Sequence, residues 1–426
     1  MTTRPRSILV VAYYFPPLGG SGALRTFNVV KGLAERGIDV GVLTTHPWTA
    51  SRDDPTLVER LPPNVEIRRT HSWDLYHVRN HLRGARGGPP PSATGGAVGT
   101  SRFLSRLLRF AIVPSPTIGW RGPAVHAARR WLHERPFDLV LTTQPPITSH
   151  LVGWDLARTE GARWVAEYRD VWVDIYYDPP PSPLHAAWYR SLERRMLRRA
   201  EKVVTVGDPL ARRLEERNPG VPVFVVPNGF DPDELRAALP YPLPPRSLLY
   251  LGTIVDGCER ALMRLMDVLP TIDPVPRFTY VGNASKEIAG ALARHAAASG
   301  LGDRYQALGF KPHHEALGYV RGATAVVVSG YPVSPFGLSG KLCEYVAAGR
   351  PVLGIVERGV VPFTDQLVDA SGGATASMND PAGLRAAVEH VLRAGAADRP
   401  ILPEASRHLE WPALAARYEE VLFGRG

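Results

Sequence analysis

Short hydrophobic runs alternate with helical patterns along almost the whole chain of 426 residues. The runs are bounded by Gly, Pro or Ser and are rich in β-branched residues, which is typical of buried strands. An alternation of strand and helix predicts parallel sheets with helices on both faces, which is the α/β class. The expected strands are 7–14, 38–43, 65–68, 138–142, 164–166, 202–206, 222–226, 248–251, 277–281, 305–310, 324–328 and 351–355.

A proline-rich stretch, residues 231–247, separates two such alternations, and its composition is typical of a linker. Each alternation has a glycine-bearing loop after its first strand. We therefore predict two doubly wound, Rossmann-like domains that face an interdomain cleft. The expected division is an N-terminal domain over 1–235, a linker over 236–247, a C-terminal domain over 248–402, and a final segment over 403–426 whose helix packs back toward the N-terminal domain.

The formal net charge is +9, and only five of the 50 basic residues are lysines. This charge suits phosphorylated substrates or an anionic membrane surface. No zinc-finger or RNA-binding motif accompanies it, so we expect no nucleic-acid partner. The two cysteines give neither a disulfide framework nor a metal pattern. Neither a signal peptide nor an apolar run of the roughly 18 residues that span a bilayer is seen, which favours the cytoplasm.

One segment suggests peripheral contact with the inner face of the cell membrane. In residues 102–112, Arg102, Arg106 and Arg109 line one face of a predicted helix, and apolar side chains lie opposite. Such a helix lies on an anionic membrane, or it is a surface helix whose apolar face meets the core. A Gly- and Pro-rich loop, residues 84–100, precedes it.

A strand–loop–helix–strand unit in the second half is the strongest candidate for a ligand site. The strand 324–328 runs into a loop rich in Gly, Pro and Ser, and a short helix begins near Ser339. A helix start offers free N–H groups to a phosphate, and Lys341 adds a cation. Lys341 and Glu344 can divide a nucleotide between them, with phosphate at the lysine and ribose hydroxyls at the glutamate. The alternative is a surface lysine and a glutamate that caps the helix at Ser339 or Gly340.

The first half carries a glycine loop and a cluster of charged residues at strand ends. Gly19 and Gly20 let the backbone approach a ligand, although the loop lacks the dinucleotide fingerprint and structural turn glycines remain an alternative. Glu167, Arg169 and Asp170 follow the strand 164–166, where they suit acid–base work or sugar hydroxyls, or else form a structural salt-bridge cluster.

The order and spacing of these motifs resemble the GT-B glycosyltransferases of the large retaining group called family 4, over nearly the whole chain. In the first domain the resemblance is carried by YYFPPLGGSGALRTFNVVKGLAERGIDVGVLT and TTQPPITSHLVGWDLARTEGARWVAEYRDVWVD. VVPNGFD resembles the entry to the linker. GFKPHHEALGYVRGATAVVVS and SGKLCEYVAAGRPVL resemble the donor-site half.

The resemblance implies that a nucleotide-sugar donor binds to 248–402 and that a hydroxyl-bearing acceptor binds to 1–235. Glu344 matches the ribose-binding glutamate of the family, and the Gly20 N–H would lie beside the donor phosphate. No metal or other cofactor is expected, so helix termini and cations have to stabilise the leaving diphosphate. The residues assigned to the donor are Gly19, Gly20, Gly252, Arg260, Gly337, Leu338, Ser339, Gly340, Lys341 and Glu344.

The chain departs from the family at three places. Phe336 stands where the first acid of the E-x7-E pair is placed by the transferred sugar, and Thr253 stands where an arginine is common. Arg260 is a possible substitute for that arginine. Gln144 and the two prolines after it replace a His-containing motif.

The sequence therefore predicts a retaining, metal-independent glycosyltransferase that moves a sugar to an acceptor hydroxyl. The residues expected to carry catalysis are Lys341, Asp170 and Arg169, and those expected on the acceptor side are His150, Glu167 and Trp172. One alternative is a nucleotide-sugar-binding subunit that has lost catalysis. Another is a different enzyme of the same fold, either a sugar-nucleotide epimerase or a phosphorylase that uses pyridoxal phosphate.

Overall fold

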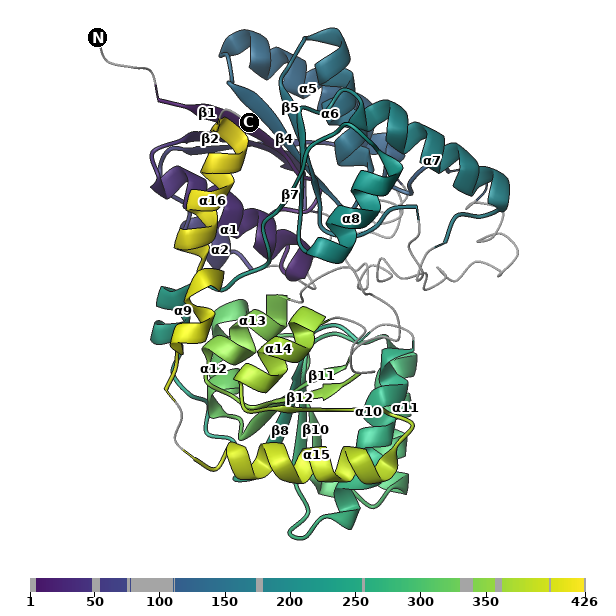
Figure 1. Ribbon diagram of the computed structural model, residues 1–426, viewed down its shortest axis with the longest axis vertical. Helices are drawn as coiled ribbons and strands as arrows, with labels where there is room; N and C mark the ends of the chain where they lie inside the picture. Colours follow the sequence, from purple (N-terminus) through teal and green to yellow (C-terminus); the bar gives the residue numbers. More distant parts are fainter. Residues whose placement is uncertain are drawn as a thin grey trace. The chain divides into compact units, whose positions relative to one another are not determined.

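A computed structural model describes residues 5–47, 54–74, 77, 110, 112–173, 179–254, 257–329, 340–356, 362–397 and 400–424. The chain divides into two compact units (Figure 1). The N-terminal unit comprises Met1–Pro227 and Leu414–Gly426, and the C-terminal unit comprises Asn228–Ala413. Each unit is described by itself.

The N-terminal unit is built on a seven-stranded parallel sheet of order β3-β2-β1-β4-β5-β6-β7. Its strands are β1 Ser7–Val11, β2 Asp39–Thr45, β3 Val65–Thr70, β4 Leu139–Gln144, β5 Trp164–Tyr168, β6 Lys202–Thr205 and β7 Val223–Val225. Its helices are α1 Ser21–Glu35, α2 Thr56–Glu59, η2 Ile118–Trp120, α5 Arg121–Glu134, α6 Thr148–Thr159, α7 Pro183–Leu197, α8 Asp208–Arg217 and most of α16 Trp411–Phe423.

The C-terminal unit repeats this plan with a six-stranded parallel sheet of order β10-β9-β8-β11-β12-β13. Its strands are β8 Ser247–Leu251, β9 Arg277–Val281, β10 Tyr305–Ala307, β11 Ala325–Ser329, β12 Val352–Ile355 and β13 Ala374–Ala376. Its helices are α9 Pro232–Ala237, α10 Cys258–Val268, η3 Leu269–Thr271, α11 Lys286–Ala298, η4 Gly302–Arg304, α12 His313–Gly322, α13 Gly340–Ala347, α14 Pro362–Ala370, α15 Pro381–Ala394 and η5 Glu404–Leu409.

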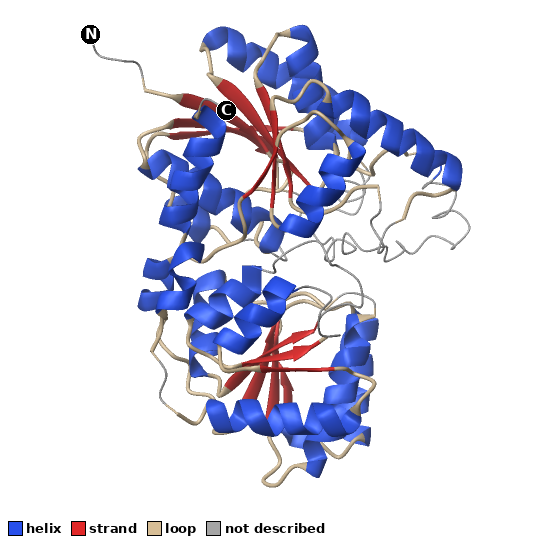
Figure 2. Cartoon of the chain, viewed as in Figure 1, coloured by secondary structure: helices blue, strands red, loops and turns tan. Residues whose placement is uncertain are grey.

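Both sheets are doubly wound, so the α/β class and the two Rossmann-like folds predicted from the alternation are confirmed. Figure 2 shows helices on both sides of each sheet. The strand order reverses between β1 and β4 in one unit and between β8 and β11 in the other. At such a switch point the loops diverge to opposite faces and leave room for a ligand at the carboxyl ends of the strands. Each predicted strand falls on an observed one, and only the three-residue β13 is absent from the prediction.

The first helix shows why these elements begin and end where they do. α1 ends in a Schellman-type turn, in which the Gly37 N–H donates to the Ala34 carbonyl and the Ile38 N–H donates to the Leu33 carbonyl. Gly37 has φ of +82°, the left-handed conformation that ends a helix in this type of turn. At its other end the helix includes Ser21, and the N-cap position is Gly20.

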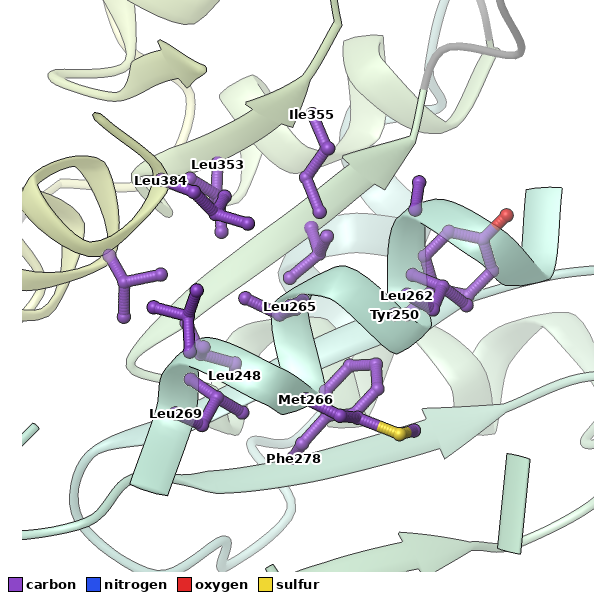
Figure 3. Close-up of a cluster of buried hydrophobic side chains, with 14 of the residues drawn as sticks. Leu248, Tyr250, Leu262, Leu265, Met266, Leu269, Phe278, Leu353, Ile355 and Leu384 are labelled. Carbon is purple, nitrogen blue, oxygen red and sulfur yellow. The ribbon is translucent and has the colours of Figure 1, made fainter. Parts of the chain in front are cut away.

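Apolar side chains from the sheet and from α10 form one core of the C-terminal unit. Leu248, Leu265 and Phe278 are fully buried in it, and Leu353 and Leu384 close it from β12 and α15 (Figure 3). Burying a leucine or phenylalanine contributes about 1.5–3 kcal/mol each. This core fixes the sheet whose carboxyl edge carries the candidate site.

The first part of the proline-rich stretch 231–247 forms a helix, of which only the last two residues fall in the predicted linker over 236–247. Asp231 caps α9 by accepting hydrogen bonds from the backbone N–H groups of Asp233 and Glu234. Leu235 is buried among the apolar side chains of the C-terminal unit. The two units therefore divide after Pro227, eight residues before the predicted boundary at 235. Proline at the first position of α9 suits a helix start, which composition alone does not distinguish from an extended linker.

Several predictions concern residues outside the described part of the chain. They are the loop 84–100, most of the segment 102–112, and the residues Phe336, Gly337, Leu338 and Ser339. Within the described ranges, no helix combines the length and the hydrophobicity that a membrane crossing requires.

Candidate functional site

Lys341 lies at the switch point of the C-terminal sheet. It is the second residue of α13, and its Nζ atom is 5.4 Å from the centre of the Tyr250 ring on β8. Ser329, the last residue of β11, has its hydroxyl 3.5 Å from that of Tyr250. A Cβ atom on Gly252 would lie 2.1 Å from Nζ, so the absence of a side chain there makes room for the ammonium. Gly252 also has φ of +118°, a conformation that other residues rarely adopt.

The charge of Lys341 has no counter-ion among the described residues. No carboxylate within those ranges lies within ion-pair distance of Nζ. Burial lowers the pKa of Lys341, and the charges of Cys258 and Glu344 oppose this only in part. A partly buried ammonium without a paired carboxylate favours the arrival of an anion, because an anion would offset the cost of removing the cation from water.

Glu344 lies three residues after Lys341 and is 8% exposed. Its Oε1 atom is 2.8 Å from Nε2 of His313, and Nδ1 of His313 is 2.8 Å from Oε1 of Glu234. The carboxylate thus has an imidazole as its partner, and no hydrogen bond to Gly340, the alternative predicted for a capping glutamate, is found among the described residues. Burial disfavours the charged imidazole, but the attraction of Glu344 and Glu234 outweighs it and raises the pKa of His313 well above its usual value.

His313 and Glu234 are absent from the site predicted by sequence. His313 is the first residue of α12, in the run PHHE, and Glu234 lies in the stretch interpreted as a linker. Two signals point toward His313: its place at a helix start beyond β10, and the run GFKPHHEALGYVRGATAVVVS, which contains it and resembles the donor-site half. No sequence pattern connects His313 with Glu234, 79 positions before it, or with Glu344, 31 positions after it.

Glycines surround Lys341 at the ends of the neighbouring strands. The Gly252 N–H donates to the Val281 carbonyl, and the Gly282 N–H donates to the Gly309 carbonyl. A Cβ atom on Gly282 would lie 2.1 Å from the Gly252 carbonyl oxygen. This close packing leaves backbone rather than side chains at the carboxyl ends of β8 and β9. Arg260 is different: it is exposed in the first turn of α10 and pairs with no described residue.

In the N-terminal unit, Arg169 lies at the switch point but is engaged with the backbone. Its guanidinium donates to the carbonyls of Gly22, Gln144 and Pro145. It therefore connects the first turn of α1 to the end of β4. These bonds give Arg169 a structural role without a ligand, although it was predicted to take part in catalysis.

Glu167 belongs to a buried cluster, which we call the Arg25 cluster, formed by Arg25, Glu167 and Tyr418. Glu167 is 1% exposed and lies 2.9 Å from Nε of Arg25, while the Tyr418 hydroxyl donates to the same carboxylate oxygen. Arg25 also donates to the carbonyls of Val226 and Pro227. Burial alone would raise the pKa of Glu167, but the charges of Arg25 and Arg169 and the hydrogen bonds to the carboxylate together outweigh it and lower the pKa. The cluster ties α1, β5 and α16 together, so Glu167 lies in the core, not on an accessible acceptor face.

The remaining residues predicted on the acceptor side are also packed inside the N-terminal unit. His150 is fully buried, its Nδ1 is 2.7 Å from the Thr142 hydroxyl, and burial lowers its pKa to about 3. A histidine that stays neutral and inaccessible does not suit a general base at neutral pH. Trp172 is 8% exposed and stacks on Tyr189 with ring centres 5.0 Å apart. Asp170, which was predicted to take part in catalysis, is only half-buried and accepts a hydrogen bond from the Val171 N–H.

The backbone of the predicted glycine loop is accessible at Gly20. Gly19 is half-buried, and Gly20 is exposed with φ of +98°. A Cβ atom on Gly20 would meet nothing within 4 Å. The residue precedes the first turn of α1, so its conformation sets the entry to the helix.

Comparisons with known proteins agree with this architecture. Residues 20–229 match the family model described as a glycosyl transferase 4-like domain. Solved structures similar over the whole chain include a glycosyltransferase from Rickettsia africae ESF-5, at 12% identity and a TM-score of 0.64, with 99% of this chain and 100% of that chain covered. Anabaena HepE in complex with UDP has 14% identity and a TM-score of 0.61, with 98% and 99% covered. No curated protein matches the sequence.

A third similar structure is described as trehalose-6-phosphate from E. coli bound with UDP-2-fluoro glucose. It has 12% identity and a TM-score of 0.65, with 98% of each chain covered. At these identities the structures establish the fold alone, which is that of the GT-B proteins with two Rossmann-like domains. The family match adds that residues 20–229 are similar to a glycosyl transferase 4-like domain.

Proposed function

We propose that this chain is a retaining glycosyltransferase that binds a nucleotide-sugar through its C-terminal unit and transfers the sugar to an acceptor hydroxyl. The observation that carries the proposal is Lys341, a partly buried ammonium at the switch point that no described carboxylate neutralises. Two of the similar structures contain UDP or a UDP-sugar, which supports a nucleotide donor. The retaining outcome rests on the resemblance to family 4.

In this proposal the donor is divided between two side chains of α13. Lys341 and the N–H groups at the start of the helix bind the diphosphate, and Glu344 accepts hydrogen bonds from the ribose hydroxyls. The difficult step is departure of the nucleoside diphosphate from the sugar. A fixed cation at the phosphate stabilises the charge that develops as this bond breaks, and it needs no rearrangement during the reaction.

Glycosyl transfer exchanges one bond at the anomeric carbon for another. The bond between the anomeric carbon and the diphosphate oxygen breaks, a bond from that carbon to the acceptor oxygen forms, and the hydroxyl proton leaves with the diphosphate or with solvent. The acceptor is assigned to the N-terminal unit by the resemblance. Among the residues predicted there, Asp170 is half-buried, while the carboxylate of Glu167 is enclosed by its partners.

A nucleotide panel tests the proposal. The intact protein is heated with UDP, GDP, ADP, dTDP or CDP, and a nucleotide present at 100 times its Kd stabilises the fold by about 2.7 kcal/mol. We expect one nucleotide to raise the unfolding temperature, and we expect its sugar conjugates to release that diphosphate when acceptor hydroxyls are supplied. Failure of every nucleotide to bind would contradict the proposal.

A second candidate function is a nucleotide-sugar-binding subunit without catalysis. It is favoured by Thr253, the half-buried residue after Gly252 at the position where the family commonly has an arginine. The same experiment separates the two candidates. Tight donor binding with no diphosphate release across a broad panel of acceptors would favour the subunit.

A further inference from the structure

Three helices of the C-terminal unit bring charged side chains together at one imidazole. His313 at the start of α12 lies between Glu234 of α9 and Glu344 of α13, at 2.8 Å from each carboxylate. Both ring nitrogens are therefore engaged, one with each glutamate. A histidine that donates from both nitrogens carries a positive charge, which two carboxylates on either side stabilise.

The end of this bridge away from Lys341 is held firmly. Glu234 is 9% exposed and lies in α9, whose start is capped by Asp231. The segment after α9 packs on α12: Tyr241 stacks on Tyr319 with ring centres 4.1 Å apart, and the Arg321 guanidinium donates to the carbonyl of Ala238. His313 is thus held between a fixed helix and a fixed carboxylate.

The other end of the bridge reaches the candidate donor site. Oε1 of Glu344 accepts the hydrogen bond from His313, whereas Oε2 accepts none from the described residues. A carboxylate held through one oxygen has a defined rotamer and keeps the second oxygen for another donor. Ribose presents two adjacent hydroxyl groups, which are donors of the right kind.

We propose that His313 is a positioning residue for the donor: anchored by Glu234, it fixes Glu344 so that the free carboxylate oxygen recognises the ribose hydroxyls. This inference rests on the proposed function. It extends the donor site to α9, which lies between β7 and β8 in the sequence. It also makes recognition of the ribose depend on His313, which does not touch the nucleotide.

The test measures how strongly the protein distinguishes ribose from deoxyribose. The probes are UDP, GDP and ADP with their 2′-deoxy counterparts, titrated into the intact protein by calorimetry. We expect wild type to bind the ribonucleotide about 10- to 100-fold more tightly than its deoxy form, as for a hydrogen bond to a charged group. His313→Leu should bring this ratio close to one.

Further variants separate positioning from a general structural effect. His313→Gln can still donate from its amide to Glu344, so it should retain part of the preference for the ribonucleotide that His313→Leu loses. Glu234→Gln should weaken this preference without removing a group near the ligand. His314→Gln is the matched control, because His314 is the next residue of α12 and is exposed. It should leave the ratio unchanged. Circular dichroism and thermal unfolding confirm that each variant is folded.

The outcomes distinguish this inference from the proposed function. If wild type prefers the ribonucleotide and both His313→Leu and Glu234→Gln keep that preference, the positioning role is wrong while the donor site stands. If His313→Leu weakens ribo- and deoxyribonucleotide equally, its role is structural and the inference is again overturned. If no ribonucleoside diphosphate binds to wild type, the proposed function fails and the inference fails with it.

Discussion

The N-terminal and C-terminal units each enclose charged side chains beside a central parallel strand, but the charges are balanced in different ways. In the Arg25 cluster, the arginine and Glu167 neutralise each other, and Tyr418 and two backbone carbonyls complete the hydrogen bonds. In the C-terminal unit, Glu344 and Glu234 share His313, and Lys341 is left without a carboxylate in the described part of the chain.

This difference separates a structural cluster from a candidate ligand site. A buried charge that has all its partners inside the protein has little to gain from a ligand. A cation without a counter-ion is costly to the folded protein unless a ligand supplies the anion. Both units place an acid and a base near a strand end, so only the contacts show that one cluster is closed and the other is open.

The largest effect is expected when the closed cluster is broken. Glu167→Gln leaves Arg25 buried without a counter-ion, which should lower the free energy of unfolding by about 3–5 kcal/mol. The measurement is denaturant unfolding at equilibrium. The control is Glu419→Gln on α16, the helix that also carries Tyr418 of the cluster. It removes a carboxylate from ion pairs with the more exposed Arg6 and Arg36. That change should cost about 0–1 kcal/mol.

If Glu167→Gln proved as mild as the control, the closed cluster would not be a structural element of the N-terminal unit. The N-terminal unit would then no longer provide an example of a closed, structural charge cluster.

A smaller effect is expected from filling the space that Gly252 leaves beside Lys341. Gly252→Ala and Gly37→Ala both place alanine at a positive φ, so each should cost about 1–3 kcal/mol of stability. Only at Gly252 does the new methyl group meet the lysine ammonium, whereas nothing lies within 4 Å of a Cβ on Gly37. Calorimetry with a nucleoside diphosphate should therefore show weakened binding for Gly252→Ala alone. Equal binding by both variants would argue against a phosphate at Lys341.

The fully buried His150 and the half-buried His313 should respond to pH in opposite directions. The pKa of His150 is lowered to about 3, so between about pH 6.5 and 3 the unfolded chain binds a proton that the folded protein does not. Stability therefore falls as the pH falls through this range, by about 2 kcal/mol at pH 5. For His313, whose pKa is raised, the stabilisation is present below about pH 6.5 and is lost as the pH rises through the raised pKa.

Unfolding free energies of wild type and His150→Asn at pH 7 and pH 5 check this prediction. The variant keeps a polar group near Thr142 but does not titrate, so its stability should fall less at pH 5. His126→Asn, at an exposed position of α5, controls for the loss of a histidine. The same decline in wild type and His150→Asn would show that His150 is not held neutral.

The fold could be predicted from the sequence, and so could Lys341 and Glu344 of the candidate site. Alternating patterns predict both sheets, because strands buried on both faces read as continuous apolar runs, and the spacing of Lys341 and Glu344 predicts a charged helix start. The roles of Glu167 and His313 depend on partners far away in the chain. Glu167 meets Arg25 and Tyr418 across 142 and 251 positions, and His313 meets Glu234 across 79. Local patterns contain no information on such contacts.

The central claim is that Lys341 is the cation of a diphosphate site, and calorimetry on a single variant tests it most directly. Lys341→Met keeps the length and removes the charge, and Lys286→Met is the control, since Lys286 is an exposed lysine at the start of α11 in the same unit. We expect Lys341→Met to weaken binding of the nucleoside diphosphate about 10- to 100-fold, as for loss of a charged hydrogen bond. It should leave binding of the phosphate-free nucleoside unchanged and should not lower the stability of the fold, because it removes a cation whose burial is unfavourable. Lys286→Met should behave as wild type. An unchanged Kd for the diphosphate in Lys341→Met would show that Lys341 does not bind the diphosphate.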